Sequence, residues 1–199
     1  SFHDTADVLD QILTRHPEVE FVQLQINYLD WEDAGIQSRL CYETAIRHGK
    51  PVVVMEPVKG GSLAQVPEEA GRILKACHPE WSPAAWALRF AAGLDQVMVV
   101  LSGMSSLEQM EENLQVLENP QPLSPEEQEA VRKAVEQIRG TVAIPCTACG
   151  YCLDGCPQQI AIPNYFALFN AEKKDPSEKP WAQRSYYANL IQNHGKASD

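Results

Sequence analysis

Four cysteines in the last third of the sequence are the residues best suited to do chemistry. Cys146, Cys149, Cys152 and Cys156 form the run C-x2-C-x2-C-x3-C, and Pro157 follows directly. Three cysteines that are each separated by two residues allow one tight loop to direct three thiolates toward the irons of a cubane, and this spacing is typical of iron–sulfur ligation. The run therefore predicts a [4Fe–4S] cluster held by these four thiolates.

Zinc binding and disulfide formation stay open as alternatives for the four cysteines. A structural zinc ion also takes four thiolates, but such sites usually combine two separated pairs of cysteines. Three ligands in one tight loop leave little room between them, so zinc ranks second. Disulfides rank third, because a chain in a reducing compartment uses clustered cysteines more often for metals or catalysis.

The fourth ligand of the cluster is a separate question. In two-cluster ferredoxins the last cysteine of such a run binds the other cluster, and this sequence contains no second run. The remaining thiols are Cys41, which lies in a helical pattern beside apolar residues, and Cys77, which stands near a helix end. Both patterns favour structural thiols. We expect Cys156 to close the same cluster.

The chain before the cysteines alternates patterns of strands and helices. Strands are expected at residues 21–29, 52–55 and 97–101, and the last two are continuously apolar, as in parallel strands that are buried on both faces. Amphipathic patterns predict helices at residues 5–15, 35–48, 82–93, 105–118 and 124–138. This order predicts a parallel α/β fold.

Serines mark the starts of three of these helices. Ser82 precedes a proline, Ser105 stands three residues before Glu108, and Ser124 opens the stretch Ser-Pro-Glu-Glu. Such serines are expected to cap the first turn through their hydroxyl oxygens.

After residue 140 the composition changes, and two more helices are expected at 164–174 and 181–192. The sequence therefore predicts an α/β domain over 1–140 and a small, mainly helical domain over 141–199.

Composition narrows the class of protein. The 199 residues carry 27 acidic and 16 basic side chains, a formal net charge of −11, so the surface is expected to repel nucleic acid. The sequence contains no apolar run of the length that spans a bilayer, and its first residues lack the pattern of a signal peptide. We expect a cytoplasmic protein without nucleic-acid or membrane partners.

The sequence resembles the C-terminal part of aldo-keto reductases, in particular a bacterial branch with a ferredoxin-like tail. The resemblance rests on SFH at the start, FVQLQINYLD, PVVVMEPVKGGSL, VMVVLSGMSSLEQMEENLQV and the cysteine run. It implies that residues 1–140 are the closing strands and helices of a (β/α)8 TIM barrel, followed by a ferredoxin-type domain. The three strands then leave two open sheet edges, and the chain is expected to be a fragment. The catalytic Asp, Tyr, Lys and His of that family lie on earlier strands, so we expect no catalytic residue in this chain and no activity from it alone.

The resemblance also implies part of a nicotinamide nucleotide site. Ser1 and Gln23 stand where the family holds the carboxamide, and Met55 stands where many members stack a tyrosine on the nicotinamide ring. Two glycines in the following loop allow the backbone to approach a pyrophosphate; they are Gly60 and Gly61. After the last strand Glu112 and Asn113 occupy the adenine positions. Gly103 and Gln109 stand where members that use NADPH place two cations, which puts the preference between NADH and NADPH in question.

Together these features predict an iron–sulfur oxidoreductase. The resemblance implies NAD(P)H-linked chemistry on a small carbonyl-type substrate in the intact protein, with the cluster exchanging electrons with a redox partner such as a ferredoxin or a flavoprotein. One alternative makes the cluster a structural or interaction element that docks an aromatic-rich tail containing Tyr165, Phe166, Phe169, Trp181 and Tyr187. Another makes the tail an electron carrier without hydride chemistry.

Overall fold

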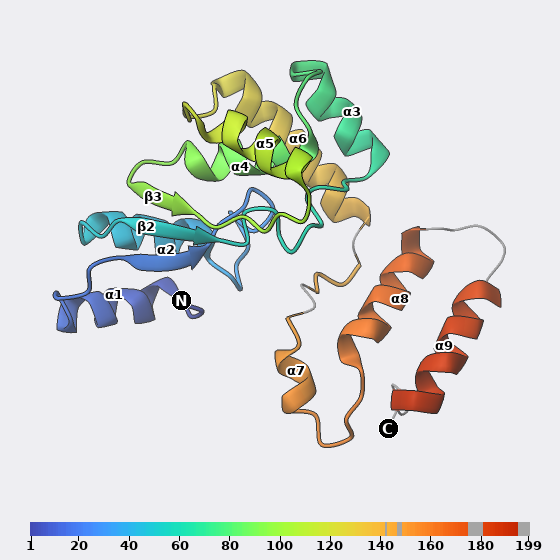
Figure 1. Ribbon diagram of the computed structural model, residues 1–199. Helices are drawn as coiled ribbons and strands as arrows, with labels where there is room; N and C mark the ends of the chain where they lie inside the picture. The colour runs from blue at the N-terminus through green and yellow to red at the C-terminus, as the bar shows by residue number, and fades with distance from the viewer. Residues whose placement is uncertain (142, 147–148, 175–180, 195–199) are drawn as a thin grey trace. The chain divides into compact units, whose positions relative to one another are not determined.

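The computed structural model describes residues 1–141, 143–146, 149–174 and 181–194 (Figure 1). The chain divides into two compact units, Ser1–Val135 and Glu136–Asp199. The sequence predicts a boundary slightly later, between residues 140 and 141. Each unit is described by itself below.

The first unit contains a parallel sheet in the order β1 (Val22–Gln25), β2 (Val52–Met55), β3 (Val97–Val100). Val22 pairs with Val52, and Val52 pairs with Val97. The β-branched valines favour this pleated, close-packed arrangement. A parallel α/β unit is therefore confirmed, with strands close to the three expected positions.

The first strand is shorter than the sequence predicts. β1 ends at Gln25, because Asn27 turns the chain: its Oδ1 accepts the backbone N–H groups of Leu29 and Asp30 at 3.1 and 2.9 Å. A side chain that satisfies its neighbours' amides in this way competes with the sheet ladder. The predicted strand over 21–29 is wrong from residue 26 onward.

The first unit contains the five expected helices and one helix, Glu68–Cys77, that was not predicted from the sequence. They are α1 (Ala6–Arg15), α2 (Ser38–Arg47), α3 (Glu68–Cys77), α4 (Pro83–Ala92), α5 (Leu107–Leu117) and α6 (Pro125–Thr141), the last of which runs across the boundary between the units.

The serine caps are confirmed at two of the three helices. Ser82 Oγ accepts the Ala85 N–H at 3.0 Å, and Ser124 Oγ accepts the Glu127 N–H at 3.2 Å. The predicted cap at Ser105 is wrong by one residue. Ser106 caps α5, and the side chain of Gln109 accepts the N–H of Ser105 instead.

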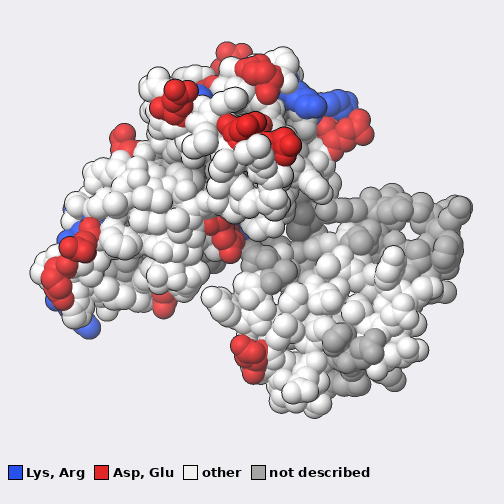
Figure 2. Space-filling view, viewed as in Figure 1, with Lys and Arg blue, Asp and Glu red and all other residues white. Residues whose placement is uncertain are grey.

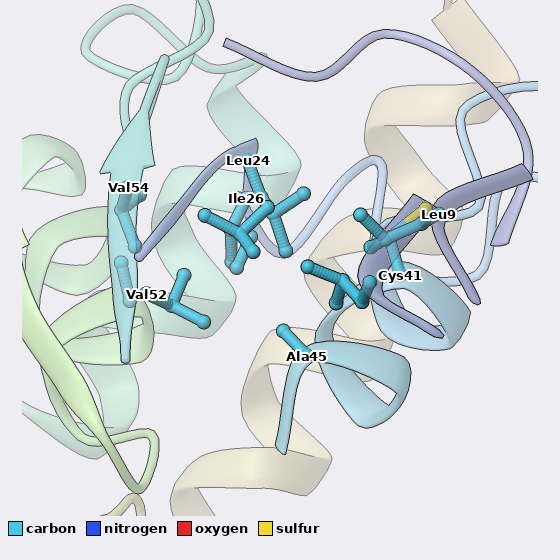
Figure 3. Close-up of a cluster of buried hydrophobic side chains, with 10 residues drawn as sticks. Leu9, Leu24, Ile26, Cys41, Ala45, Val52 and Val54 are labelled. Carbon is cyan, nitrogen blue, oxygen red and sulfur yellow. The ribbon is translucent and has the colours of Figure 1, made fainter. Parts of the chain in front are cut away.

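The main core lies between one face of the sheet and its helices (Figure 3). Alternate residues of β1 and β2 meet Leu9 and Leu13 of α1, Cys41 and Ala45 of α2, and Ala91 of α4. Cys41 is 3% exposed, so its predicted role as a core thiol is confirmed. The apolar area buried here is the main force that holds the helices on this face.

Apolar side chains on β3 and α5 stay exposed. Met98 is 58% and Leu114 is 64% exposed, although the sequence predicts that β3 is buried on both faces. That expectation is wrong for β3 and correct for most of β2, where Val52, Val53 and Val54 are buried. The exposed set consists of Met98, Val99, Leu101, Met104, Leu107, Met110 and Leu114.

The described elements of the second unit, beyond the end of α6, are helices: α7 (Tyr151–Asp154), α8 (Ile162–Lys174) and α9 (Trp181–His194). Tyr165 of α8 meets Tyr187 of α9 edge to face at 5.7 Å between ring centroids. Phe169 remains 40% exposed, and the side chain of Trp181 lies outside the described residues. Among the described residues, no helix is long and apolar enough to span a bilayer.

Candidate functional site

A groove of about 470 Å³ opens beside the carboxyl ends of β2 and β3. One wall is the loop after β2, and the other is the segment that joins β3 to α5. In parallel sheets the loops at this end of the strands build the binding sites. The groove has the volume of a small-molecule site. Its lining includes four of the predicted cofactor residues, Gly60, Gly61, Glu112 and Asn113.

The loop after β2 has an unusual backbone. Glu56, Lys59, Gly60 and Gly61 all have positive φ angles, of 52°, 48°, 59° and 91°. Such angles are easy for glycine and unfavourable for other residues. Hydrogen bonds from the N–H groups of Gly61 and Leu63 to the Val58 carbonyl, both 3.1 Å, close the loop. Within the described part of the chain the Gly60 N–H has no acceptor, so it is available to a ligand.

The opposite wall is built by the segment after β3 together with residues of α5. Asn113 is only 8% exposed, and its Nδ2 donates to Ser102 Oγ at 3.2 Å. That bond leaves the Asn113 carbonyl oxygen able to accept from a ligand. The Gln109 side chain is held by Ser105, whose N–H it accepts at 2.8 Å.

The charge of the groove is negative. Glu56 and Glu112 are among its lining residues, and the described lining contains neither Lys nor Arg. Figure 2 shows that acidic side chains outnumber basic ones on one face of the molecule.

Two residues of the lining have further features. A Cβ placed on Gly103 meets no atom within 4 Å, so this position has room for a side chain. The Glu56 Oε2 atom is buried without a hydrogen-bond partner in the described part of the chain. Sequence reasoning did not select Glu56; its position directly after a buried strand is the signal that identifies it.

A buried ion pair lies behind the first wall and was also not predicted. Lys59 Nζ contacts Asp30 Oδ1 and Oδ2 at 2.5 and 2.7 Å, and both side chains are less than 10% exposed. Asp30 Oδ2 also accepts from Gln25 Nε2 at 2.8 Å and from Asn27 Nδ2 at 2.9 Å. The sequence signal is a pair of opposite charges just after two adjacent strands.

The predicted carboxamide residues lie on and beside the sheet, away from the lining of the groove. Gln23 Nε2 donates to Met55 Sδ at 3.5 Å, and the Phe2 N–H donates to the Gln23 carbonyl at 2.9 Å. Ser1 is thereby next to β1, where its Oγ is 3.2 Å from His3 Nε2. Gln23 and Met55 thus lie on the neighbouring strands β1 and β2, and Ser1 lies in the segment that precedes α1.

The cysteine motif occupies a loop around a short helix. Cys146, Cys149 and Cys152 are exposed, and Cys156 is partly buried. Gly150 turns the chain at a φ of 82°. The Ile160 N–H lies 3.4 Å from Cys156 Sγ, so this sulfur accepts a backbone hydrogen bond.

The four thiols fit an iron–sulfur cluster by type and by order along the chain. They are not gathered around a common point: among the described residues, no three His, Cys, Asp or Glu side chains lie close enough together to hold a metal ion. Residues 147 and 148, which include the small residue between the first two cysteines, lie outside the described part.

The thiols outside the motif are poor metal ligands. Burial raises the pKa of Cys41 to about 11, with a smaller contribution from Asp4. The pKa of Cys77 is also raised, first by burial and then by the carboxylates of Glu126, Glu127 and Glu80. Since metals bind the thiolate, both effects disfavour ligation by these residues.

Comparison with known sequences identifies the first unit. The sequence model of the Aldo/keto reductase family matches residues 1–136. The chain belongs to the aldo/keto reductase family. A comparison with curated proteins gave no match.

Solved aldo/keto reductases share the fold. The holo and apo forms of aldo-keto reductase AKR11C1 from Bacillus halodurans are each 25% identical to this chain, with a TM-score of 0.50. Each match covers 65% of this chain, and 46% of the holo or 47% of the apo protein. The chain thus spans about half the length of these structures. Its first unit is a part of an aldo/keto reductase barrel, which confirms the expected α/β class and family.

The aldo/keto reductase match ends before the cysteines. Residue 136 is its last residue, so the cluster motif at 146–156 lies outside the matched region. The groove and the ion pair lie inside it.

Proposed function

We propose that this aldo/keto reductase binds a nicotinamide nucleotide in the groove and works as an oxidoreductase on a small carbonyl-type substrate. The observation that supports this most directly is the groove itself, at the carboxyl ends of β2 and β3, with a glycine loop on one wall and Glu112 and Asn113 on the other. When bound, the nucleotide supplies or accepts a hydride.

The residues of the chain would hold the two ends of the nucleotide. Gly60 and Gly61 allow the backbone to approach the pyrophosphate, and the Gly60 N–H offers a donor to it. Asn113 and Glu112 supply polar groups for the adenosine end. On β1 and β2, Gln23 and Met55 meet at 3.5 Å, so an amide and a thioether are available to a nicotinamide beside the sheet, with Ser1 as a further donor.

The groove fits NADH better than NADPH. A 2′-phosphate carries about two negative charges, and the described lining offers Glu56 and Glu112 without a compensating Lys or Arg. We therefore propose NADH as the preferred nucleotide.

The proton donor for carbonyl reduction is proposed to come from further β/α units of the barrel. The catalytic positions of the family precede the strands of this chain, and the chain spans about half the length of the similar structures. In this proposal residues 1–136 contribute nucleotide binding rather than proton transfer.

Nucleotide binding tests this function. Equilibrium titration of the protein with NADH, followed by tryptophan fluorescence or calorimetry, is expected to give saturable binding. Gly61→Ala is expected to weaken it at least tenfold, because the new Cβ strains a φ of 91° in the wall of the groove.

Gly49→Ala is the matched control. Gly49 also has a positive φ, of 65°, and open space for an added Cβ, but it follows the C-cap of α2 and does not line the groove. It is expected to lower stability without changing NADH affinity. Equal binding by Gly61→Ala and the parent protein would count against the groove as the site.

We further propose that Cys146, Cys149, Cys152 and Cys156 hold a [4Fe–4S] cluster that exchanges electrons with a ferredoxin or flavoprotein partner. The donor set supports this, and so does the hydrogen bond from the Ile160 N–H to Cys156 Sγ, since such bonds stabilise cluster thiolates and tune the potential. This bond favours Cys156 as the fourth ligand.

Anaerobic purification tests the cluster. Broad absorption near 400 nm with about four irons and four sulfides per chain is expected. Cys156→Ser is expected to lose most of this iron, whereas Cys77→Ser retains it. A colourless protein with one zinc would instead support a structural metal site.

A structural role for the cluster is the second candidate. The contact between Tyr165 and Tyr187 favours it, because α8 and α9 pack through aromatic side chains next to the motif in sequence. A reduction potential outside the cellular range would support this role, and a reversible potential within it would support electron transfer.

A further inference from the structure

We propose that Asp30 and Lys59 are a positioning pair that holds the loop after β2 in the shape that forms the nucleotide groove. The role in binding rests on the proposed function, whereas the effect on the loop does not. The pair joins the carboxyl ends of two adjacent strands, since Asp30 follows β1 and Lys59 follows β2.

The ion pair is buried, and both oxygens of its carboxylate are in contact with the lysine. Lys59 contacts both oxygens of Asp30, and the side chains are 8% and 5% exposed. Gln25 and Asn27 donate two further hydrogen bonds to the same carboxylate. A buried charge without such partners is strongly unfavourable, so the ammonium group of Lys59 is held beside the carboxylate of Asp30. That position fixes where the side chain of Lys59 enters the loop.

The same cluster reaches a second point of the loop. Asn27 Nδ2, which donates to Asp30, also lies 3.1 Å from the carbonyl oxygen of Glu56. Glu56 and Lys59 are the two residues other than glycine that adopt positive φ angles in this loop, at 52° and 48°. Both conformations are unfavourable by themselves and persist only where surrounding contacts impose them. Asp30 and its amide partner provide a contact at each of these residues.

The pair acts through the loop and not by contact with the groove. Pro57, Val58, Gly60 and Gly61 line the groove, whereas neither Asp30 nor Lys59 is among its lining residues. Removing the charges is therefore expected to move the loop without substituting any residue that lines the groove. This separates positioning from ligand contact.

The test compares variants that treat the charges differently. Lys59→Met leaves the Asp30 charge unpaired and is expected to lower stability. The double variant Asp30→Leu with Lys59→Met removes both charges and is expected to fold, since apolar replacement of a buried pair is often tolerated. Asp30→Glu keeps both charges but lengthens one arm, which provides a second folded variant with a displaced loop.

Two measurements are made on each folded variant. Amide hydrogen exchange of residues 59–64 is expected to accelerate at least tenfold in the double variant and in Asp30→Glu, while exchange in the sheet stays unchanged. NADH affinity is expected to fall at least tenfold in both. Arg39→Met is the control, because Arg39 forms exposed ion pairs with Glu32 and Glu43 and does not line the groove, and it is expected to change neither quantity.

The outcomes separate the two proposals. Parental exchange rates at residues 59–64 in both folded variants would overturn the positioning role. Faster exchange with unchanged NADH affinity would keep the effect on the loop but overturn its link to binding. A parent protein that binds no NADH would refute the proposed function, and the exchange rates alone would then decide whether the pair holds the loop.

Discussion

At the scale of single residues, the proposed preference of the groove for NADH predicts an effect of substituting Gly103. The position has open space for a side chain, and the described lining of the groove carries no cation. Gly103→Lys is expected to raise NADPH affinity about tenfold, since a charge-assisted contact with phosphate contributes roughly 1.5–3 kcal/mol before the loss of side-chain freedom. NADH affinity is expected to change little. Competitive titration with the two nucleotides measures the ratio.

The control for Gly103→Lys is Gln115→Lys. Gln115 is exposed on α5, the helix that follows Gly103, and the substitution adds the same charge at a position that does not line the groove. If both variants raise NADPH affinity equally, the gain comes from the reduced net charge of the protein and not from a contact at Gly103.

The cysteines differ in their expected reactivity. Because burial raises the pKa of Cys41 to about 11, only about 0.1% of it is thiolate at pH 8. The reactive fraction grows as the pH rises toward this pKa. In cluster-free protein, mass spectrometry after iodoacetamide treatment at pH 8 is expected to show modified Cys152 and unmodified Cys41. Rapid modification of Cys41 in folded protein would contradict its burial.

At the scale of helices and strands, the capping residues of α4 and α1 differ in whether their side chains hydrogen-bond to the first turn of the helix. Ser82→Ala removes the hydrogen bond from the Ala85 N–H and is expected to lower the free energy of unfolding by about 1 kcal/mol. Thr5→Ala changes the corresponding position of α1, where the structure has no side-chain cap, and is expected to have a much smaller effect. Urea unfolding followed by circular dichroism measures both.

The sequence predicts local features well where one residue acts on its own helix or strand. Ser82 and Ser124 begin their helices as expected, and Val52 to Val54 form a buried strand. The early end of β1 was missed because it depends on Asn27, a side chain that turns its own backbone. Lys59 was missed as a partner of Asp30 because the two residues are 29 positions apart, and their contact depends on β1 and β2 lying side by side.

In the candidate site, too, the sequence identifies single residues better than it identifies contacts between distant residues. The resemblance to aldo-keto reductases pointed to the two glycines and Asn113, and the structure brings them to one groove. The pairing of Gln23 with Met55 depends on the register of β1 and β2, which a single sequence does not fix.

At the scale of the whole molecule, the exposed apolar face of β3 and α5 points to a further covering layer. Met98 and Leu114 are 58% and 64% exposed, and β3 is an outer strand of the three-stranded sheet among the described residues. Large exposed apolar patches and open strand edges favour association. We propose that further β/α units of an aldo/keto reductase barrel cover this face.

This proposal predicts that one substitution has different effects in the 1–199 chain and in a protein that contains the remaining barrel units. In the chain of residues 1–199 alone, Leu114→Lys is expected to reduce concentration-dependent self-association, measured by sedimentation velocity, because it breaks the apolar patch. In a protein that supplies the remaining barrel units, the same change is expected to lower the free energy of unfolding by more than about 1 kcal/mol, since it places a charge in a buried interface. Phe169→Lys, on the exposed side of α8, is the control and is expected to alter neither quantity by a comparable amount. A monomeric 1–199 chain together with an unaffected longer protein would mean that the face is solvent-exposed in the functional molecule.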